Sequence, residues 1–214
     1  MTSLSTACRA RIANLTNTAA GRKIIGIAAP PGAGKSTLAA QMAAALGERC
    51  QVVPMDGFHL AQAEIDRLGL TSRKGSPPTF DSAGYVALLQ RIRDQTVNDA
   101  NDAKDAVIYA PTFNRAIEEP IAGAIAIHPE TELIITEGNY LLLACGAWAG
   151  VRPLLDEVWY LDIDPALRHA RLLARHQQFG RSAPEAEAWI ACNDALNAEL
   201  VEASKYRADW IIRS

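Results

Sequence analysis

Long apolar segments are absent from this chain of 214 residues. No stretch approaches the eighteen or so apolar residues that a helix needs to cross a bilayer. Residues 1–15 include Arg9 and Arg11 but no apolar core of the length found in signal peptides. These absences argue against a membrane protein and against a secreted one. We therefore expect a cytoplasmic protein with no membrane partner.

Cysteine motifs are also missing. The four cysteines, Cys8, Cys50, Cys145 and Cys192, lie far apart and form no C-x-x-C pair. Separated cysteines without neighbouring histidines are typical of reduced thiols in cytosolic proteins, which argues against a disulfide framework. We expect most of the four to be buried as small hydrophobic side chains.

The chain has no excess of positive charge, because 21 lysines and arginines stand against 24 acids and leave a net charge of −3. A general binder of nucleic acid would be basic, so we expect no nucleic-acid partner. Any phosphate site must then be a local cluster of basic residues. With 49% apolar and 21% charged residues, the composition is that of an ordinary globular domain, and residues 1–214 are expected to form one.

A glycine-rich turn near the N-terminus has the features of a phosphate-binding loop. The apolar run Lys23–Ala28 precedes it, and an alanine-rich helical pattern from Ser36 to about Gly47 follows it. Small residues let the backbone wrap closely around an anion, and the N–H groups of a helix N-terminus point at it. This layout is called a P-loop. Its residues are Gly32, Ala33, Gly34, Lys35, Ser36 and Thr37.

The P-loop predicts ATP and Mg²⁺ as cofactors. Lys35 would contact the β- and γ-phosphates, and the Ser36 hydroxyl would be a ligand of Mg²⁺. The full pattern begins with a glycine where this chain has Ala29, which is followed by Pro30 and Pro31. Proline has no N–H group, but the donors come mainly from residues 32–37. The alternative is a glycine-rich turn that ends in Lys-Ser by chance.

Strands alternate with helices along most of the chain, which predicts a parallel sheet with ligands at the carboxyl ends of its strands. The expected fold class is α/β: a three-layer P-loop NTPase fold with about five core strands and helices on both faces. Residues 57–120 break the alternation, and we interpret them as a substrate-side insertion. We expect helices at 6–20, 36–47, 61–68, 82–95, 165–179 and 184–206, strands at 23–28, 51–55, 107–109, 121–127, 133–136, 158–161 and 209–212, and a polar turn at 98–105.

Two acids follow apolar strands. Glu137 occupies the place of a Walker-B acid, where a carboxylate would hold Mg²⁺ opposite Ser36. Asp56 follows the strand after the P-loop helix, where a carboxylate can accept the proton of an alcohol that attacks the γ-phosphate. Each acid also has a plainer interpretation as a turn residue, since each precedes a glycine.

The helix expected after Pro165 is rich in basic residues. Arg168, Arg171 and Arg175 are three and four positions apart and therefore share one helix face. Arginines aimed at a transferring phosphoryl group stabilise its charge, and a mobile helix that bears them can exclude water. We predict a lid at residues 165–183, with Arg171 and Arg175 as its catalytic arginines. A solvated helix face is the alternative.

These motifs together resemble the phosphoribulokinase/uridine kinase/pantothenate kinase family of P-loop small-molecule kinases, and the chain is also similar to bacterial proteins labelled fructose transport system kinase. The family implies ATP- and Mg²⁺-dependent transfer to a hydroxyl of a small metabolite, such as a sugar, a nucleoside or a pantothenate-like alcohol. The resemblance covers most of the chain. Besides the P-loop it rests on Met55–Phe58, Arg73–Pro77, Phe80-Asp81, Glu137-Gly138, Asp162–Asp164 with the arginines that follow, and Ala208–Ile212.

The resemblance also implies roles for single residues. It assigns Lys35 to the phosphates, Ser36 and Glu137 to Mg²⁺, and Asp56 to the base, with Arg171 and Arg175 in the lid. A homodimer is included among the expected assemblies, and the sequence does not identify the acceptor. The candidate acceptor-pocket residues are His59, Arg73, Lys74, Phe80, Phe113, Arg115, Asn139 and Tyr140.

Two other functions are weighed against a kinase. A GTPase-type switch would resemble the known guanine readers in an Asn-Lys-x-Asp segment, and no lysine here follows an asparagine. An ATPase or assembly factor would hydrolyse ATP without phosphorylating a metabolite. The substrate-side insertion, with its arginine and aromatic residues, would then lack a purpose, so the kinase is the leading hypothesis.

Overall fold

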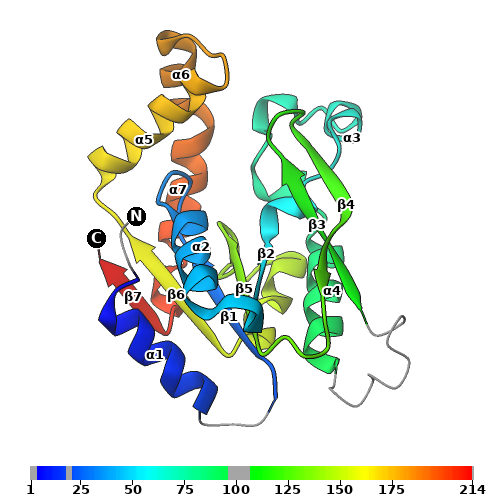
Figure 1. The fold of residues 1–214 in the computed structure, drawn as a ribbon. Coiled ribbons are helices and arrows are strands. Elements are labelled where there is room, and N and C mark those ends of the chain that lie inside the picture. The colour runs from blue at the N-terminus through cyan, green and yellow to red at the C-terminus, as the bar shows by residue number, and fades with distance from the viewer. Residues whose placement is uncertain (1–3, 18–20, 96–106, 214) are drawn as a thin grey trace.

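A parallel sheet of five strands forms the centre of the molecule (Figure 1). The computed structural model describes residues 4–17, 21–95 and 107–213. The strand order is β2-β5-β1-β6-β7, and every neighbouring pair is parallel. The prediction of about five parallel core strands is therefore confirmed. The strands are β1 Lys23–Ala28, β2 Cys50–Pro54, β5 Leu133–Gly138, β6 Glu157–Asp162 and β7 Trp210–Arg213.

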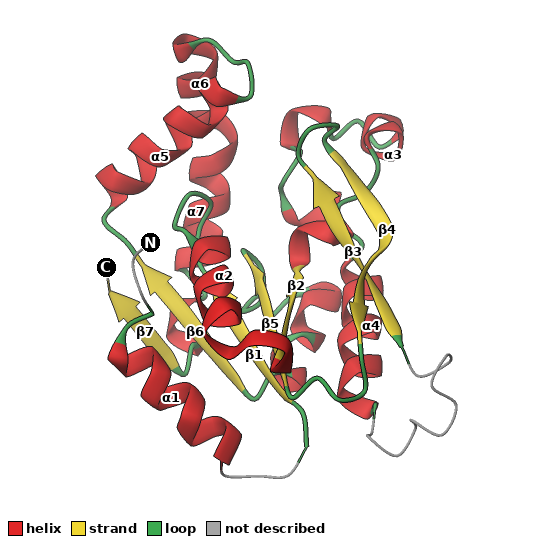
Figure 2. Cartoon of the chain, in the orientation of Figure 1, coloured by secondary structure: helices red, strands yellow, loops and turns green. Residues whose placement is uncertain are grey.

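Most helices form close to their expected positions, and Figure 2 shows them on both sides of the sheet. The first helix is described up to Asn17, so the expected end at 18–20 lies outside the described residues, as does the polar turn at 98–105. Asp81 begins α4 as an N-cap, because its side chain accepts from the Gly84 N–H. The helices are α1 Thr6–Asn17, α2 Lys35–Leu46, α3 Gln62–Arg67, α4 Ser82–Asp94, α5 Pro165–Gln178, α6 Ala183–Trp189 and α7 Ala195–Glu202.

Strand β1 illustrates how the three layers are held together. Successive side chains of a strand point to opposite faces of its sheet. Ile24 belongs to a hydrophobic cluster with Tyr85 of α4, whereas Ile25 belongs to a second cluster with Met42 of α2. All four side chains are fully buried. The apolar run that predicts a strand is thus continuous because both of its faces are covered, and the three-layer α/β fold is confirmed.

The helix expected at 184–206 is helical from Ala183 to Glu202, but its hydrogen-bond pattern changes in the middle and it ends earlier than predicted. A π-helical turn, Ile190–Asp194, separates α6 from α7, and α7 ends at Glu202. The helical apolar spacing runs through this turn, so the sequence pattern does not reveal the interruption. The turn brings Asn193 and Asp194 into buried positions.

The substrate-side segment contains an antiparallel hairpin of β3 (Ile108–Asn114) and β4 (Glu119–Ile127). The strand expected at 107–109 is longer than predicted and includes residues 111–114. Its partner extends to Ile127, beyond the 57–120 range expected for the insertion. The hairpin packs on the turn Met55–Phe58 that follows β2, and it is separate from the parallel sheet.

Gly57 allows this close packing. A Cβ atom built on Gly57 would lie 2.4 Å from the Pro111 carbonyl oxygen, which is backbone and cannot rotate away. Replacing Gly57 by alanine should therefore lower the free energy of unfolding by about 1–3 kcal/mol, the usual cost of overpacking an interior. Urea unfolding measures this change. Gly150→Ala is the matched control, because the nearest atom to its Cβ would be a Val86 side-chain methyl carbon at 3.2 Å, and no backbone atom would lie closer. Equal losses in the two variants would contradict the packing argument.

The cysteines divide evenly between interior and surface. Cys8 and Cys50 are buried, whereas Cys145 and Cys192 are exposed, and all four are free thiols. The expectation that most of them are buried is therefore wrong. Burial raises the pKa of the Cys50 thiol to about 12, which makes it unreactive. Among the described residues, no helix is long and apolar enough to cross a membrane.

Candidate active site

A cleft of about 840 Å³ lies at the carboxyl ends of the sheet strands, where open α/β sheets bind their ligands. Its lining comes from the P-loop, the turn after β2, the β3–β4 hairpin, α5 and the π turn. In Figure 1, α5 and α6 stand on one side of this edge and the hairpin stands on the other. A volume of this size is ordinary for a small-molecule site.

The P-loop has the backbone that its glycines predict. Gly32 and Gly34 have φ angles of 80° and 97°, which lie in the left-handed region that favours glycine. A Cβ atom on Gly32 would also lie 2.7 Å from Leu172 Cγ in α5. Pro30 and Pro31, which precede these glycines, have no N–H to donate. The Pro30 carbonyl instead accepts from the Ala33 N–H at 3.3 Å.

Lys35 is buried at the start of α2, with 9% of its surface exposed. Its Nζ donates to the Pro30 carbonyl at 3.1 Å and to Asn139 Oδ1 at 2.7 Å. Burial lowers the pKa of Lys35, whereas the negative charges of Glu137 and Asp56 raise it. Phosphates bound at the P-loop would add further negative charge beside the buried Lys35 ammonium.

Ser36 and Glu137 form the second contact between the P-loop and β5. Ser36 Oγ donates to Glu137 Oε1 at 2.7 Å, and Glu137 is 6% exposed. Burial raises the pKa of Glu137, the nearby Asp56 raises it further, and Lys35 lowers it. Among the described residues there is no cluster of three or more His, Cys, Asp or Glu side chains that could hold a metal. A hydroxyl and one carboxylate nevertheless fit Mg²⁺, which is usually bound by one or two carboxylates and the substrate phosphates.

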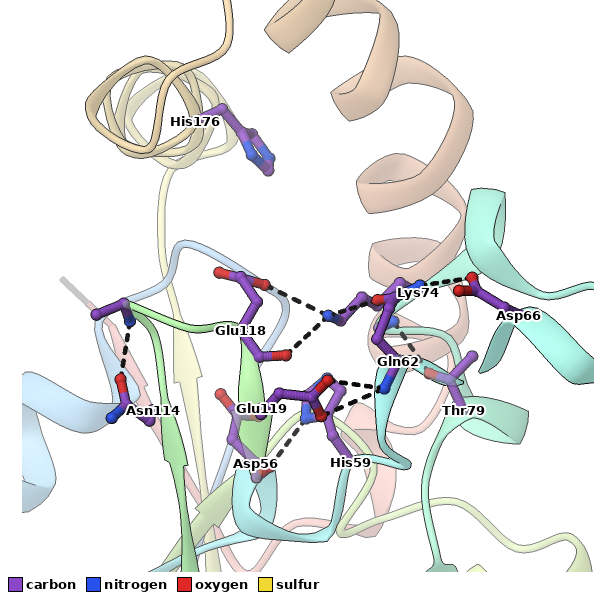
Figure 3. A network of polar contacts seen from close by, with 12 residues as sticks. Asp56, His59, Gln62, Asp66, Lys74, Thr79, Asn114, Glu118, Glu119 and His176 are labelled. Carbon is purple, nitrogen blue, oxygen red and sulfur yellow. Dashed lines mark hydrogen bonds and ion pairs between the residues drawn. The ribbon is translucent and has the colours of Figure 1, made fainter. Parts of the chain in front are cut away.

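Asp56 lies in the turn after β2, opposite the P-loop. Its Oδ2 accepts from Arg115 Nη2 at 2.9 Å, and the carboxylate is 28% exposed. His59 Nδ1 lies 2.9 Å from the backbone carbonyl of Asp56 (Figure 3). Since a carbonyl only accepts, Nδ1 must be the donor in this contact. Burial lowers the pKa of His59, and Asp56 raises it.

Aromatic rings line the side of the cleft that includes Asp56 and the β3–β4 hairpin. The His59 ring centroid lies 4.0 Å from that of Phe80 and 4.6 Å from that of Phe113. Lys74 Nζ and Arg115 Cζ lie 5.8 and 5.9 Å from the Phe113 centroid. Two cations therefore share one ring beside Asp56, within the range of a cation–π contact.

Lys74 crosses this side of the cleft, as Figure 3 shows. Its Nζ donates to Gln62 Oε1 at 2.9 Å and to the Glu118 carbonyl at 3.0 Å. Glu118 has a φ angle of 55°, the only positive value among the described residues other than glycine. Such strain persists where surrounding contacts impose it, and here the Lys74 hydrogen bond holds the hairpin turn.

The three arginines of α5 have different surroundings. Arg171 Nη1 donates to the Ala33 carbonyl of the P-loop at 3.3 Å. Arg175 lines the cleft, and its guanidinium makes no hydrogen bond to another side chain among the described residues. Burial lowers the pKa of Arg175, Arg115 lowers it further, and Asp194 raises it. Arg168 does not line the cleft and pairs instead with Glu202 at 3.8 Å.

Three predicted site residues do not line the cleft. Ala33 is 2% exposed and packs on Leu161, so it offers only backbone. Arg73 is exposed in the turn Thr71–Arg73. Tyr140 is fully buried, donates its hydroxyl hydrogen to the Gly75 carbonyl and stacks edge-on with Phe80. The Tyr140 side chain thus packs in the core, although its neighbour Asn139 lines the cleft.

The other predicted residues all line the cleft, together with several that the motifs do not single out. His176 and Arg181 lie within residues 165–183, the predicted lid, but nothing in the sequence assigns them to the cleft. Asp194 and Asn197 lie within an apparently regular helical pattern and carry no local signal. The residues added by the structure include Gln62, Glu118, His176, Arg181, Trp189, Asp194 and Asn197.

Comparisons with known proteins bear on this site. No family model matches the sequence. A Schizosaccharomyces pombe protein named "Putative uridine kinase C227.14" is 34% identical over 203 residues, which cover 90% of this chain and 83% of the relative. The ATP-dependent kinase YFH7 of Lachancea thermotolerans is 30% identical over 76% of this chain, and the match spans 56% of that longer relative.

A solved structure resembles the whole molecule. The crystal structure of a "putative fructose transport system kinase" from Silicibacter sp. TM1040 superposes with a TM-score of 0.85 and 34% sequence identity. The match covers 99% of this chain and all of the other. The resemblance in sequence and in fold thus extends over both the P-loop half and the hairpin half of the cleft.

Proposed function

Since the chain belongs to the family of ATP-dependent P-loop kinases that includes the uridine kinase-like and fructose transport system kinase-like proteins, we propose that it transfers the γ-phosphoryl group of ATP to a hydroxyl of a small metabolite. Sugars, nucleosides and pantothenate-like alcohols are the acceptor classes that we propose. Asp56 is the proposed base, and residues 165–183 are the proposed lid.

The observation that supports this proposal is the position of Asp56 in the same cleft as the P-loop. Its charge raises the pKa of both Lys35 and Glu137, so the three groups interact electrostatically. An acceptor hydroxyl next to Asp56 would therefore lie near phosphates held by Lys35 and the P-loop amides. Placing the two reactants together in this way supplies much of the catalysis in phosphoryl transfer.

In the proposed reaction, Asp56 takes the hydroxyl proton as the acceptor oxygen forms a bond to the γ-phosphorus and the bond to the ADP oxygen breaks. Arg115, which pairs with Asp56 at 2.9 Å, would have to give up that contact so that the Asp56 oxygen is open to the acceptor hydroxyl. Arg171 and Arg175 would stabilise charge on the transferred group. Mg²⁺, held by Ser36, Glu137 and the phosphates, would neutralise charge on the polyphosphate.

A screen for acceptor-dependent ADP release tests the proposal. Two cations, Lys74 and Arg115, line the cleft next to Asp56, where we propose that the acceptor binds. The panel should therefore contain matched neutral and acidic pairs: glucose and gluconate, uridine and uridine 5′-phosphate, pantothenol and pantothenate. We expect ADP release to rise strongly with at least one acceptor. ADP release that no acceptor stimulates would favour the ATPase alternative and contradict the kinase.

Arg175→Gln should lower transfer by about 10²-fold, a typical loss when one preorganised donor to a transition state is removed. The variant keeps length and polarity but has no charge. Arg168→Gln is the matched control, because Arg168 is on the same helix, does not line the cleft, and pairs with the half-exposed Glu202. Comparison of kcat in the two variants measures the effect, and equal values would contradict the role of Arg175.

A further inference from the structure

The π turn Ile190–Asp194 buries two successive polar side chains next to the cleft. Asn193 is 2% exposed and Asp194 is 6% exposed. Burial of polar groups is unfavourable unless each finds a partner, and π turns are rare features that often occur at functional sites. Neither side chain has a part in the proposed transfer of the phosphoryl group. Their partners therefore indicate what the turn does.

Asn193 holds the acceptor side. Its Nδ2 donates to the Lys74 carbonyl at 2.8 Å. Lys74 belongs to residues 73–80, which we call the acceptor loop because Lys74 and Phe80 both line the cleft. Other contacts also hold this loop, among them Gly75 N–H to Thr79 Oγ1 at 3.0 Å and the Tyr140 hydroxyl to the Gly75 carbonyl at 2.5 Å, and the Asn193 bond is its contact with the π turn. Asn193 thus fixes the backbone from which Lys74 extends to Gln62 and the hairpin.

Asp194 holds the helix on the nucleotide side. Its Oδ2 lies 2.7 Å from His176 Nε2, near the C-terminal end of α5. Arg181 Nη1 lies 2.8 Å from His176 Nδ1, and its guanidinium stacks 4.0 Å from the Trp189 ring. Because arginine has only donors, Nδ1 is the acceptor and Nε2–H donates to Asp194. His176 directly follows Arg175 in the same helix, so this contact fixes the helix turn that bears Arg175.

We propose that Asn193 and Asp194 are positioning residues that couple nucleotide binding at α5 to the geometry of the acceptor loop. The proposal rests on the proposed function, since it takes α5 to contact the nucleotide phosphates. Two adjacent residues of one buried turn move together, so a shift of α5 on nucleotide binding is passed through His176 and Asp194 to Asn193 and the Lys74 carbonyl. The coupling orders the acceptor side once ATP is bound.

Amide hydrogen exchange with and without the non-hydrolysable analogue AMP-PNP and Mg²⁺ tests this coupling. In the wild-type protein, nucleotide should slow exchange at the start of α2 and also in the acceptor loop, there by at least about fivefold, the lower end of ordinary coupling between sites. In Asn193→Ala, slowing at α2 should persist and slowing in the acceptor loop should be lost. Ser204→Ala is the matched control, because it removes another buried hydrogen bond, Oγ to the Val201 carbonyl, just after α7.

His176→Leu, which removes both the donor to Asp194 and the acceptor from Arg181, tests the other end of the link and keeps the proposal falsifiable if Asn193→Ala does not fold. It should give the same selective loss in the acceptor loop. The coupling would be overturned if nucleotide slowed exchange in the acceptor loop of both variants as much as it does in the wild-type protein. It would also be overturned if nucleotide did not slow exchange in the acceptor loop of the wild-type protein. No slowing at α2 in the wild-type protein would instead contradict nucleotide binding at the P-loop, and with it the proposed function.

Discussion

Asp56→Asn should lower phosphoryl transfer by about 10²- to 10⁴-fold, the range that general-base catalysis contributes. Asparagine has the size of aspartate and an oxygen that can still accept from Arg115, so the fold and the cleft should be preserved. Its amide cannot take a proton from an acceptor hydroxyl. The measurement is kcat with the acceptor that the screen identifies, together with the Kd of ATP from calorimetry, which should change little.

Two comparisons make the Asp56 result specific. Asp66→Asn is the matched control, because Asp66 is an acid of α3 that accepts from Thr71 and Gln62 and does not line the cleft. It should retain wild-type turnover. Arg115→Gln distinguishes loss of the ion pair from loss of the base, because it removes the charged partner of Asp56 and keeps the Asp56 carboxylate. Near wild-type turnover in Asp56→Asn would exclude the assigned role as base.

Lys35→Met should lower turnover by about 10²- to 10³-fold, comparable to the loss of an oxyanion-hole donor. Methionine fills the buried space but removes the ammonium that donates to Asn139 and the Pro30 carbonyl. The charge of Lys35 lowers the pKa of Glu137, so its loss should raise that pKa further. ATP affinity and turnover should therefore both fall in this variant, whereas only turnover should fall in Asp56→Asn.

The contrast between these two variants distinguishes binding from transfer. Lys23→Met is the matched control for removal of a lysine charge, because Lys23 pairs with Asp156 at the opposite end of β1. It should leave ATP affinity unchanged. If Lys35→Met bound ATP as tightly as the wild type, the P-loop lysine would have no phosphate contact, and the arrangement of the nucleotide in the cleft would have to be reconsidered.

The P-loop could be predicted because its determinants are local. Gly32 and Gly34 permit left-handed backbone, and the apolar run before them is a strand that is buried on both faces. The parallel topology then brings the ends of β1, β2 and β5 to one edge, which is why Asp56 and Glu137 could be expected near Lys35. In the structure all three line one cleft.

Adjacent residues in the sequence can face opposite sides of the chain, and the sequence does not show which residue faces the cleft. Asn139 and Tyr140 both follow β5, yet Asn139 accepts from Lys35 whereas Tyr140 is buried against Phe80. Which of the two faces the cleft depends on the path of the chain after the strand. Similarly, Thr112, Phe113 and Asn114 belong to a strand because β4 pairs with them, and that pairing has no signal in the segment itself.

Local sequence patterns suffice to predict the α/β sheet, the phosphate-binding loop and the acids at the strand ends, because glycine conformation and the periodicities of helices and strands act over short distances along the chain. The π turn and the residues that it buries depend on contacts between distant parts of the chain. Asn193 meets Lys74 across 119 positions of sequence, and Asp194 meets His176 across 18. Hydrogen bonds between such distant residues favour a π turn over a regular α-helical turn only after the chain has folded, so no local pattern could predict it.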